Sequence, residues 1–134
     1  MKGKTILSVL ICATILVAVA LESHAAGARV RCRVESGRLK IQVDGQDLAR
    51  GTYSARVKNA RTGKIVNTEA SKVRTVTIAP DDIDLDFDST AGSADLDSFV
   101  PASFANAGDT VRAGVINIKT GVTVAAASNS CVRK

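Results

Sequence analysis

The stretch RVRCRVESGRLKIQV, at residues 29–43, alternates apolar and polar residues on both sides of a Ser-Gly pair. Every second residue is apolar, first over residues 30–34 and then over residues 39–43. A period of two is typical of strands with one buried and one exposed face. The stretch therefore predicts a β-hairpin. Its exposed face is basic and consists of Arg29, Arg31, Arg33, Arg38 and Lys40.

The same period recurs along the chain, and no stretch keeps a helical period over three turns. We predict further strands at residues 52–58, 65–69, 74–79, 83–88, 110–118 and 122–127, with possible pairing around Cys131. Asp44-Gly45 is expected to end the second strand and open a loop to Gly51. Residues 91–107 leave open a strand near 98–104 or a short helical turn, because Pro101 argues against a central strand.

About eight short strands without helices predict an all-β fold. We expect a single immunoglobulin-like two-layer β-sandwich, mostly antiparallel, over residues 26–134. The chain has no Trp, so the comparison with antibody domains concerns the architecture alone. A small closed β-barrel is the alternative.

The N-terminal segment, residues 1–25, has the three parts of a secretory signal peptide. Lys2 and Lys4 form a positive start, residues 6–21 are an uncharged apolar run, and Ser23 and Ala25 are small residues before a cut after Ala25. The apolar run is short for a membrane span of roughly 20 residues. We therefore predict a cleaved signal peptide, a secreted or periplasmic location and no membrane span in the mature chain. An uncleaved anchor is the alternative.

Cleavage would remove Cys12, one of three cysteines, and leave Cys32 and Cys131 near the two ends of the mature chain. An even pair in an exported protein predicts a disulfide, here between the first and last strands. Closing a loop of about 100 residues contributes on the order of 4 to 5 kcal/mol in the chain-entropy model. Two unpaired buried thiols are the alternative.

A weak internal repeat relates residues 53–66 to residues 111–124. Each copy reads as a strand, a Thr-Gly turn and a second strand, which predicts two similar hairpins. Either a duplication or a shared turn chemistry explains the match. The first copy contains Ala55, Val57, Asn59, Thr62, Gly63 and Val66, and the second contains Ala113, Val115, Asn117, Thr120, Gly121 and Val124.

Side chains suited to catalysis are scarce. The only histidine, His24, lies in the predicted leader, so the mature chain would lack the usual general base and histidine-dependent zinc sites. A hydrolase using two carboxylates would need a cleft lined with aromatic groups, and the chain has no Trp, one Tyr and three Phe. We predict no catalytic residues and no enzyme activity.

The acidic residues concentrate in one run: Asp81, Asp82, Asp84, Asp86, Asp88, Asp95 and Asp97. Four of them, Asp84, Asp86, Asp88 and Asp95, have the spacing of positions 1, 3, 5 and 12 of a calcium-binding loop. Calcium is therefore a possible cofactor, although Ser89 stands where such a loop has Gly. The alternative is that the acidic run pairs with the basic hairpin, within one molecule or between two copies.

These features predict an exported, non-catalytic structural, adhesive or assembly module of a cell surface or periplasm, with segregated basic and acidic surfaces. A calcium-stabilised binding module is the second hypothesis, and a carboxylate-dependent hydrolase is the third. The expected partner is a protein or a surface polymer, with self-association through opposite charges. Nucleic acid is not expected, because the one candidate stacking residue, Tyr53, is predicted to face the core.

Overall fold

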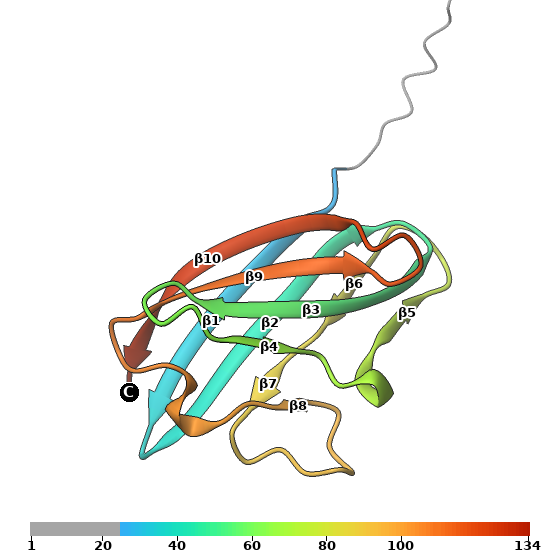
Figure 1. Ribbon diagram of the computed structural model, residues 1–134. Coiled ribbons are helices and arrows are strands. Elements are labelled where there is room, and N and C mark those ends of the chain that lie inside the picture. The colour runs from blue at the N-terminus through green and yellow to red at the C-terminus, as the bar shows by residue number, and fades with distance from the viewer. Residues whose placement is uncertain (1–24) are drawn as a thin grey trace, which may run out of the picture.

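The computed structural model describes residues 25–134, which form two packed layers of strands (Figure 1). The front layer in this view contains β10, β9, β3 and β4, and β1 and β2 cross behind it. The predicted signal peptide, with Cys12 and His24, lies outside the described residues, except for Ala25 at its end. The strands are β1 (Gly27–Glu35), β2 (Arg38–Leu48), β3 (Gly51–Asn59), β4 (Ile65–Asn67), β5 (Arg74–Val76), β6 (Asp81–Asp84), β7 (Phe87–Asp88), β8 (Ser98–Phe99), β9 (Thr110–Asn117) and β10 (Thr123–Arg133). Two single-turn 3-10 helices, η1 (Ala70–Lys72) and η2 (Ala102–Phe104), lie in the connections.

The last strand, β10, joins the two layers into one sheet. Its residues 123–130 pair antiparallel with β9, and its end, from Cys131 to Arg133, pairs in parallel with β1. The strand order is β4-β3-β9-β10-β1-β2-β7-β8, with β5 beside β3 and β6 beside β2. The fold is thus a sandwich that is nearly a closed barrel, which confirms the predicted all-β class. The two layers are continuous through β10 instead of forming two separate sheets.

The opening hairpin has the predicted structure. All of β1 pairs with β2, from Gly27 opposite Gln46 to Glu35 opposite Arg38. The turn residues Ser36 and Gly37 have positive φ angles of 48° and 79°. Two successive positive φ angles are typical of the two-residue turns whose twist matches that of the flanking strands.

The prediction that Asp44-Gly45 ends the second strand is wrong. β2 continues to Leu48, because Gly45 pairs with β1 on one side and with Ile83 of β6 on the other. A Cβ atom on Gly45 would lie 2.8 Å from Cδ1 of Leu48, so a larger residue here would displace the buried Leu48 side chain. The register then shifts between Gly45 and Leu48, where Asp47 has a φ of 53°. This Asp-Gly pair therefore precedes a bulge within a strand instead of forming a turn.

The predicted strand at residues 83–88 is divided into β6 and β7. The N–H of Val43 on β2 donates to the side-chain Oδ1 of Asp86, at 3.0 Å, instead of to a backbone carbonyl. This contact interrupts the ladder between the two short strands. Farther along, both alternatives for residues 98–104 occur in part: β8 comes first, and η2 follows Pro101.

The core lies between the layers and consists of the alternate residues that the strands turn inward. Tyr53 is among its largest side chains, and its hydroxyl donates to the carbonyl of Ala49 at 2.7 Å. The fully buried members include Leu39, Ile41, Val43, Leu48, Val57, Val76, Phe87, Val100, Val111 and Val115.

The internal repeat corresponds to two hairpins with the same turn chemistry. In β3–β4, the Oδ1 of Asn59 accepts the N–H groups of Arg61 and Thr62, at 2.8 and 3.3 Å. In β9–β10, the Oδ1 of Asn117 accepts the N–H groups two and three residues on, at 3.0 and 3.3 Å. Gly63 and Gly121 then take positive φ angles of 75° and 72°. The sequence match therefore extends to individual hydrogen bonds.

The two hairpins are also related in space. β3 and β9 lie side by side and antiparallel, with Ala55 opposite Val115 and Val57 opposite Ala113. Because Ala55 is equivalent to Ala113 and Val57 to Val115 in the repeat, exchanging the copies converts one pair into the other. A local two-fold axis between β3 and β9 therefore relates the hairpins.

Candidate functional site: a basic face and an acidic edge

The predicted disulfide joins the first and last strands. Cys32 of β1 and Cys131 of β10 are register partners in the parallel pair, with Cα atoms 4.4 Å apart. Both cysteines are 2% exposed, and the bond closes a loop with a sequence separation of 99 residues. The bridge lies where β10 changes layers, so it fastens the front layer to the back layer.

The predicted basic hairpin divides into free and paired residues. Arg29 and Arg31 are exposed on β1, and Arg33 donates from Nη2 to Oε1 of Gln42 at 3.2 Å. A small cavity of about 160 Å³ lies beside Arg33, Glu35, Arg38 and Lys40. Among residues 25–134, Arg38 is the one arginine of this set that forms an ion pair with a carboxylate.

Arg38 binds Asp88 through two nitrogens. Its Nε lies 3.0 Å from Oδ1, and its Nη2 contacts Oδ2. Asp88 is 3% exposed and also accepts the N–H and hydroxyl of Thr90, at 3.0 and 2.9 Å. The Arg38 guanidinium holds the pKa of the Asp88 carboxyl well below its usual range. The predicted pairing of the acidic run with the basic hairpin therefore occurs within the molecule at this position.

Two other carboxyl groups of the same region have raised pKa values. Burial raises the pKa of Asp86 to about 6, and the nearby Asp84 adds to the effect. Asp44 of β2 lies directly opposite Asp84 of β6. Burial, followed by the hydrogen bond to Asp84, raises the pKa of Asp44. Like charges opposite each other on neighbouring strands repel, so protonation relieves this cluster.

The four residues predicted to bind calcium lie at different places and have different partners. Asp84 and Asp86 lie in and after β6, and Asp88 is held by Arg38. Asp95 lies in the following loop and accepts the N–H of Gly92. Within residues 25–134, no group of three or more His, Cys, Asp or Glu side chains is arranged to hold a metal ion. Calcium binding stays a prediction, which thermal unfolding with and without millimolar calcium would test.

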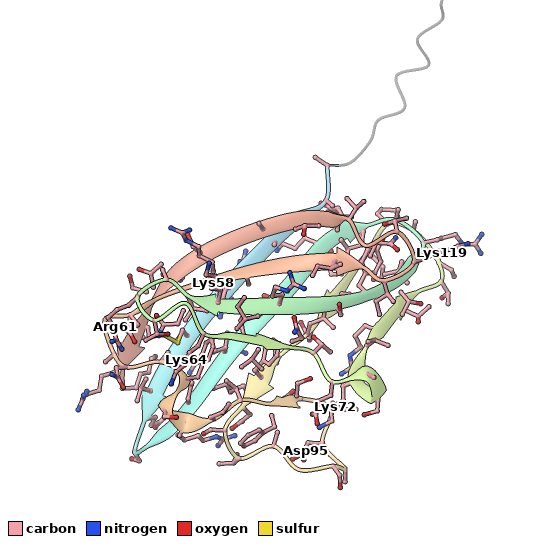
Figure 2. All side chains as sticks on the ribbon, in the orientation of Figure 1. Lys58, Arg61, Lys64, Lys72, Asp95 and Lys119 are labelled. Atoms are coloured by element: carbon pink, nitrogen blue, oxygen red, sulfur yellow. A yellow bond between two sulfur atoms is a disulfide. The ribbon has the colours of Figure 1, made fainter. Side chains whose placement is uncertain are left out.

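The loop after β7 closes around a different cation, the ammonium of Lys72 (Figure 2). Its Nζ lies 2.9 Å from the carbonyl oxygen of Gly92, 2.6 Å from that of Asp97 and 2.8 Å from Oε2 of Glu69. Lys72 is 8% exposed. The sequence pattern did not indicate this role, because Lys72 is distant along the chain from the loop it binds and lies outside the predicted strands.

A second basic surface, which the sequence reasoning missed, lies on the outer side of the front layer. Lys58 of β3 stands opposite Arg112 of β9, and Arg56 lies two residues before Lys58 on the same side. All three are exposed, and none forms an ion pair with a residue of the described chain. We call Arg56, Lys58 and Arg112 the basic face. Their alternation with buried residues is the signal that could have identified it.

No residue of β3, β4, β9 or β10 is acidic. Exposed carboxylates collect instead on β6, which pairs with β2 and has no second strand partner in the described sheet. We call Asp81, Asp82 and Asp84 the acidic edge. The basic face and the acidic edge therefore lie on different strands of the described sheet, with the basic face on β3 and β9 and the acidic edge on β6.

Comparison with known proteins yields no match to a family model, a curated protein or a solved structure. Within the part of the chain that the structure describes, no helix has the length and apolar character needed to cross a membrane.

Proposed function

We propose that this chain is exported and serves as a non-catalytic structural or assembly module of a cell surface or periplasm. The predicted leader and the disulfide support an oxidising destination. Its contacts would be made by charge, with the basic face of one copy against the acidic edge of the next.

The observation that carries this proposal is the separation of uncompensated charge. The residues of the basic face lie on β3 and β9, and neither these strands nor their neighbours β4 and β10 contain an acidic residue. Intramolecular pairing uses Arg38, Arg61 and Lys72, and leaves Arg56, Lys58 and Arg112 without an acidic partner among residues 25–134. Exposed charges of this kind add little to the stability of a single copy, but they orient association and select partners.

When each copy uses its basic face for one neighbour and its acidic edge for another, the chains associate head to tail instead of closing as a two-fold dimer. Such head-to-tail contacts produce rings or open filaments. Head-to-tail contact suits an assembly module, because each added copy presents a new basic face and a new acidic edge to the next.

Charge reversal on each surface tests the proposal. We expect Lys58→Glu/Arg112→Glu and Asp81→Lys/Asp82→Lys to be monomeric separately and to associate with each other when mixed, because reversed surfaces are again complementary. Light scattering at low salt gives the masses. Arg133→Glu/Lys134→Glu is the matched control, since it makes the same charge change at the exposed end of β10 and should associate like the unaltered chain. Mixed variants that stay monomeric would contradict the proposed contact.

A further inference from the structure

The local two-fold axis makes Gly51 and Asp109 equivalent positions. Each lies two residues before one copy of the repeat. Asp109 is followed by Thr110, which contacts the turn of the first hairpin. Gly51 is followed by Thr52, which contacts the turn of the second hairpin. The backbone contacts agree: Ala60 donates to the carbonyl of Thr110 at 2.9 Å, and the equivalent Ile118 donates to the carbonyl of Thr52 at 2.9 Å. The surroundings of Asp109 and Gly51 can therefore be compared residue by residue.

At the Asn59 turn of the first hairpin, the carboxylate of Asp109 fills a pocket. It accepts Nε and Nη2 of Arg61 at 2.7 and 2.9 Å, Nδ2 of Asn59 at 3.0 Å and the N–H of Asn106 at 2.9 Å. Asn59 is fully buried and Asp109 is 8% exposed. Arg61 holds the pKa of Asp109 well below its usual range, so the group is a carboxylate.

The equivalent turn of the second hairpin, at Asn117, has glycine at the position equivalent to Asp109. Asn117 replaces Asn59, Lys119 replaces Arg61, and Gly51 stands at the position of Asp109. A Cβ atom on Gly51 would lie 3.0 Å from Nδ2 of Asn117, so a side chain here would point at the amide. Gly51 has a φ of 157°, which L side chains rarely adopt. The chain therefore cannot readily supply the missing group from this position.

The space beside Gly51 is open and basic. A cavity of about 610 Å³ is lined by residues that include Arg50, Asn117 and Lys119, and none of the residues 25–134 that line it is acidic. Arg50 donates from Nε to the carbonyl of Thr77 at 2.7 Å, which fixes the guanidinium and leaves its terminal nitrogens for another acceptor. Figure 2 shows Lys119 and Arg61 at opposite ends of the front layer, as the two-fold relation requires.

We propose that Arg50, Gly51, Asn117 and Lys119 form a carboxylate-binding socket at the Asn117 turn. This socket receives from another molecule the group that Asp109 supplies to the Asn59 turn. A carboxylate fits the donors, since an amide N–H, an ammonium and a guanidinium would all donate to its two oxygens. This inference deepens the proposed function, because it names the group that an acidic partner surface would present to this end of the front layer.

Nuclear magnetic resonance of the labelled protein tests the socket. The probe is N-acetyl-aspartate amide, added against sodium chloride at matched ionic strength. We expect saturable shifts of the Asn117 side-chain amide and the Gly51 N–H, without equal shifts at Asn59, whose pocket is filled. Lys119→Gln should weaken binding about tenfold, as loss of one charge-assisted hydrogen bond does. Lys64→Gln, in the exposed turn of the other hairpin, is the control and should bind like the unaltered chain.

The source of the carboxylate is tested by dilution. If the acidic edge of a second copy fills the socket, the Asn117 and Gly51 signals will shift with protein concentration before any probe is added, and Lys119→Gln will abolish that dependence. If a different molecule supplies it, these signals will respond to the probe alone. Either result supports the socket.

Shifts that sodium chloride reproduces, or that Lys119→Gln leaves unchanged, would overturn the socket. This outcome is distinct from failure of the proposed function. A chain that associates at low salt but ignores the probe keeps the charge-driven contact and loses the socket. A chain that binds the probe and never associates keeps the socket and loses the assembly role.

Discussion

Asp86 and Asp88 lie two residues apart, but the pKa of Asp86 is raised and the pKa of Asp88 is lowered. Asp88 faces Arg38, whereas Asp86 is partly buried near Asp84 and Asp44. In an alternating strand both side chains would point the same way, so the sequence pattern does not distinguish them. The difference arises because the ladder breaks between β6 and β7, where the side chain of Asp86 turns to the N–H of Val43.

Asp86→Asn should stabilise the protein at neutral pH. The folded pKa of Asp86 is about 6, above the ordinary value of 3.8. Its contribution to stability is therefore present below about pH 4 and is lost as the pH rises through 6. The asparagine keeps an oxygen for the Val43 N–H and carries no charge. We expect a higher melting temperature at pH 7.5, with the gain disappearing near pH 4, as measured by calorimetry.

Asp88→Asn should have the opposite effect. The pKa of Asp88 is lowered in the folded chain, so its contribution is present at neutral pH and is lost as the pH falls below the ordinary carboxyl value. We expect a melting temperature several degrees lower at pH 7, and a smaller difference in acid. Equal melting temperatures at pH 7 would show that the Arg38 pair does not stabilise the fold.

At the scale of elements, the two Asn turns provide an internal comparison. Asn59 is fully buried and also donates to the Phe104 carbonyl and to Asp109, whereas Asn117 is partly exposed. We expect Asn59→Ala to cost about 2 to 3 kcal/mol and Asn117→Ala about 1 kcal/mol, because truncation leaves more unpaired buried groups in the first case. Urea unfolding of both variants measures the difference. Equal losses would contradict the assignment of the filled pocket.

Elements defined by local chemistry were predictable from the sequence. The first hairpin and the two repeat hairpins follow from alternation and from turn residues such as Gly37 and Gly63. The extension of β2 through Gly45 was not predictable, because it depends on pairing with β6, which follows only after β3, β4 and β5 in the chain. The binding of the Lys72 ammonium by the loop after β7 was not predictable for the same reason. Lys72 contacts Gly92 and Asp97 only in the folded chain.

At the scale of the whole molecule, the buried disulfide should contribute strongly to stability. It closes a loop with a sequence separation of 99 residues and joins the layers at the point where β10 changes partners. Replacing both Cys32 and Cys131 with Ala should lower the free energy of unfolding by on the order of 4 to 5 kcal/mol. Denaturant unfolding measures this loss. A loss under about 1 kcal/mol would contradict a stabilising bridge.

The layered β architecture and the pairing of the terminal cysteines followed from composition and period. The path of β10 did not, since residues 123–133 give no local signal at Cys131 that the strand leaves β9 for β1. The basic face also depends on strand pairing that no local signal predicts. Lys58 and Arg112 are far apart in the sequence, and only the pairing of β3 with β9 places them opposite each other.

The most direct test of the assembly proposal is sedimentation velocity of residues 26–134 over a range of protein concentrations. We predict that the mass increases with concentration at about 0.01 M salt, where charges interact over about 30 Å, and returns to the monomer near 1 M, where they interact over about 3 Å. Lys58→Glu/Arg112→Glu should remain monomeric in both. A chain that stays monomeric at high concentration and low salt would contradict the proposal.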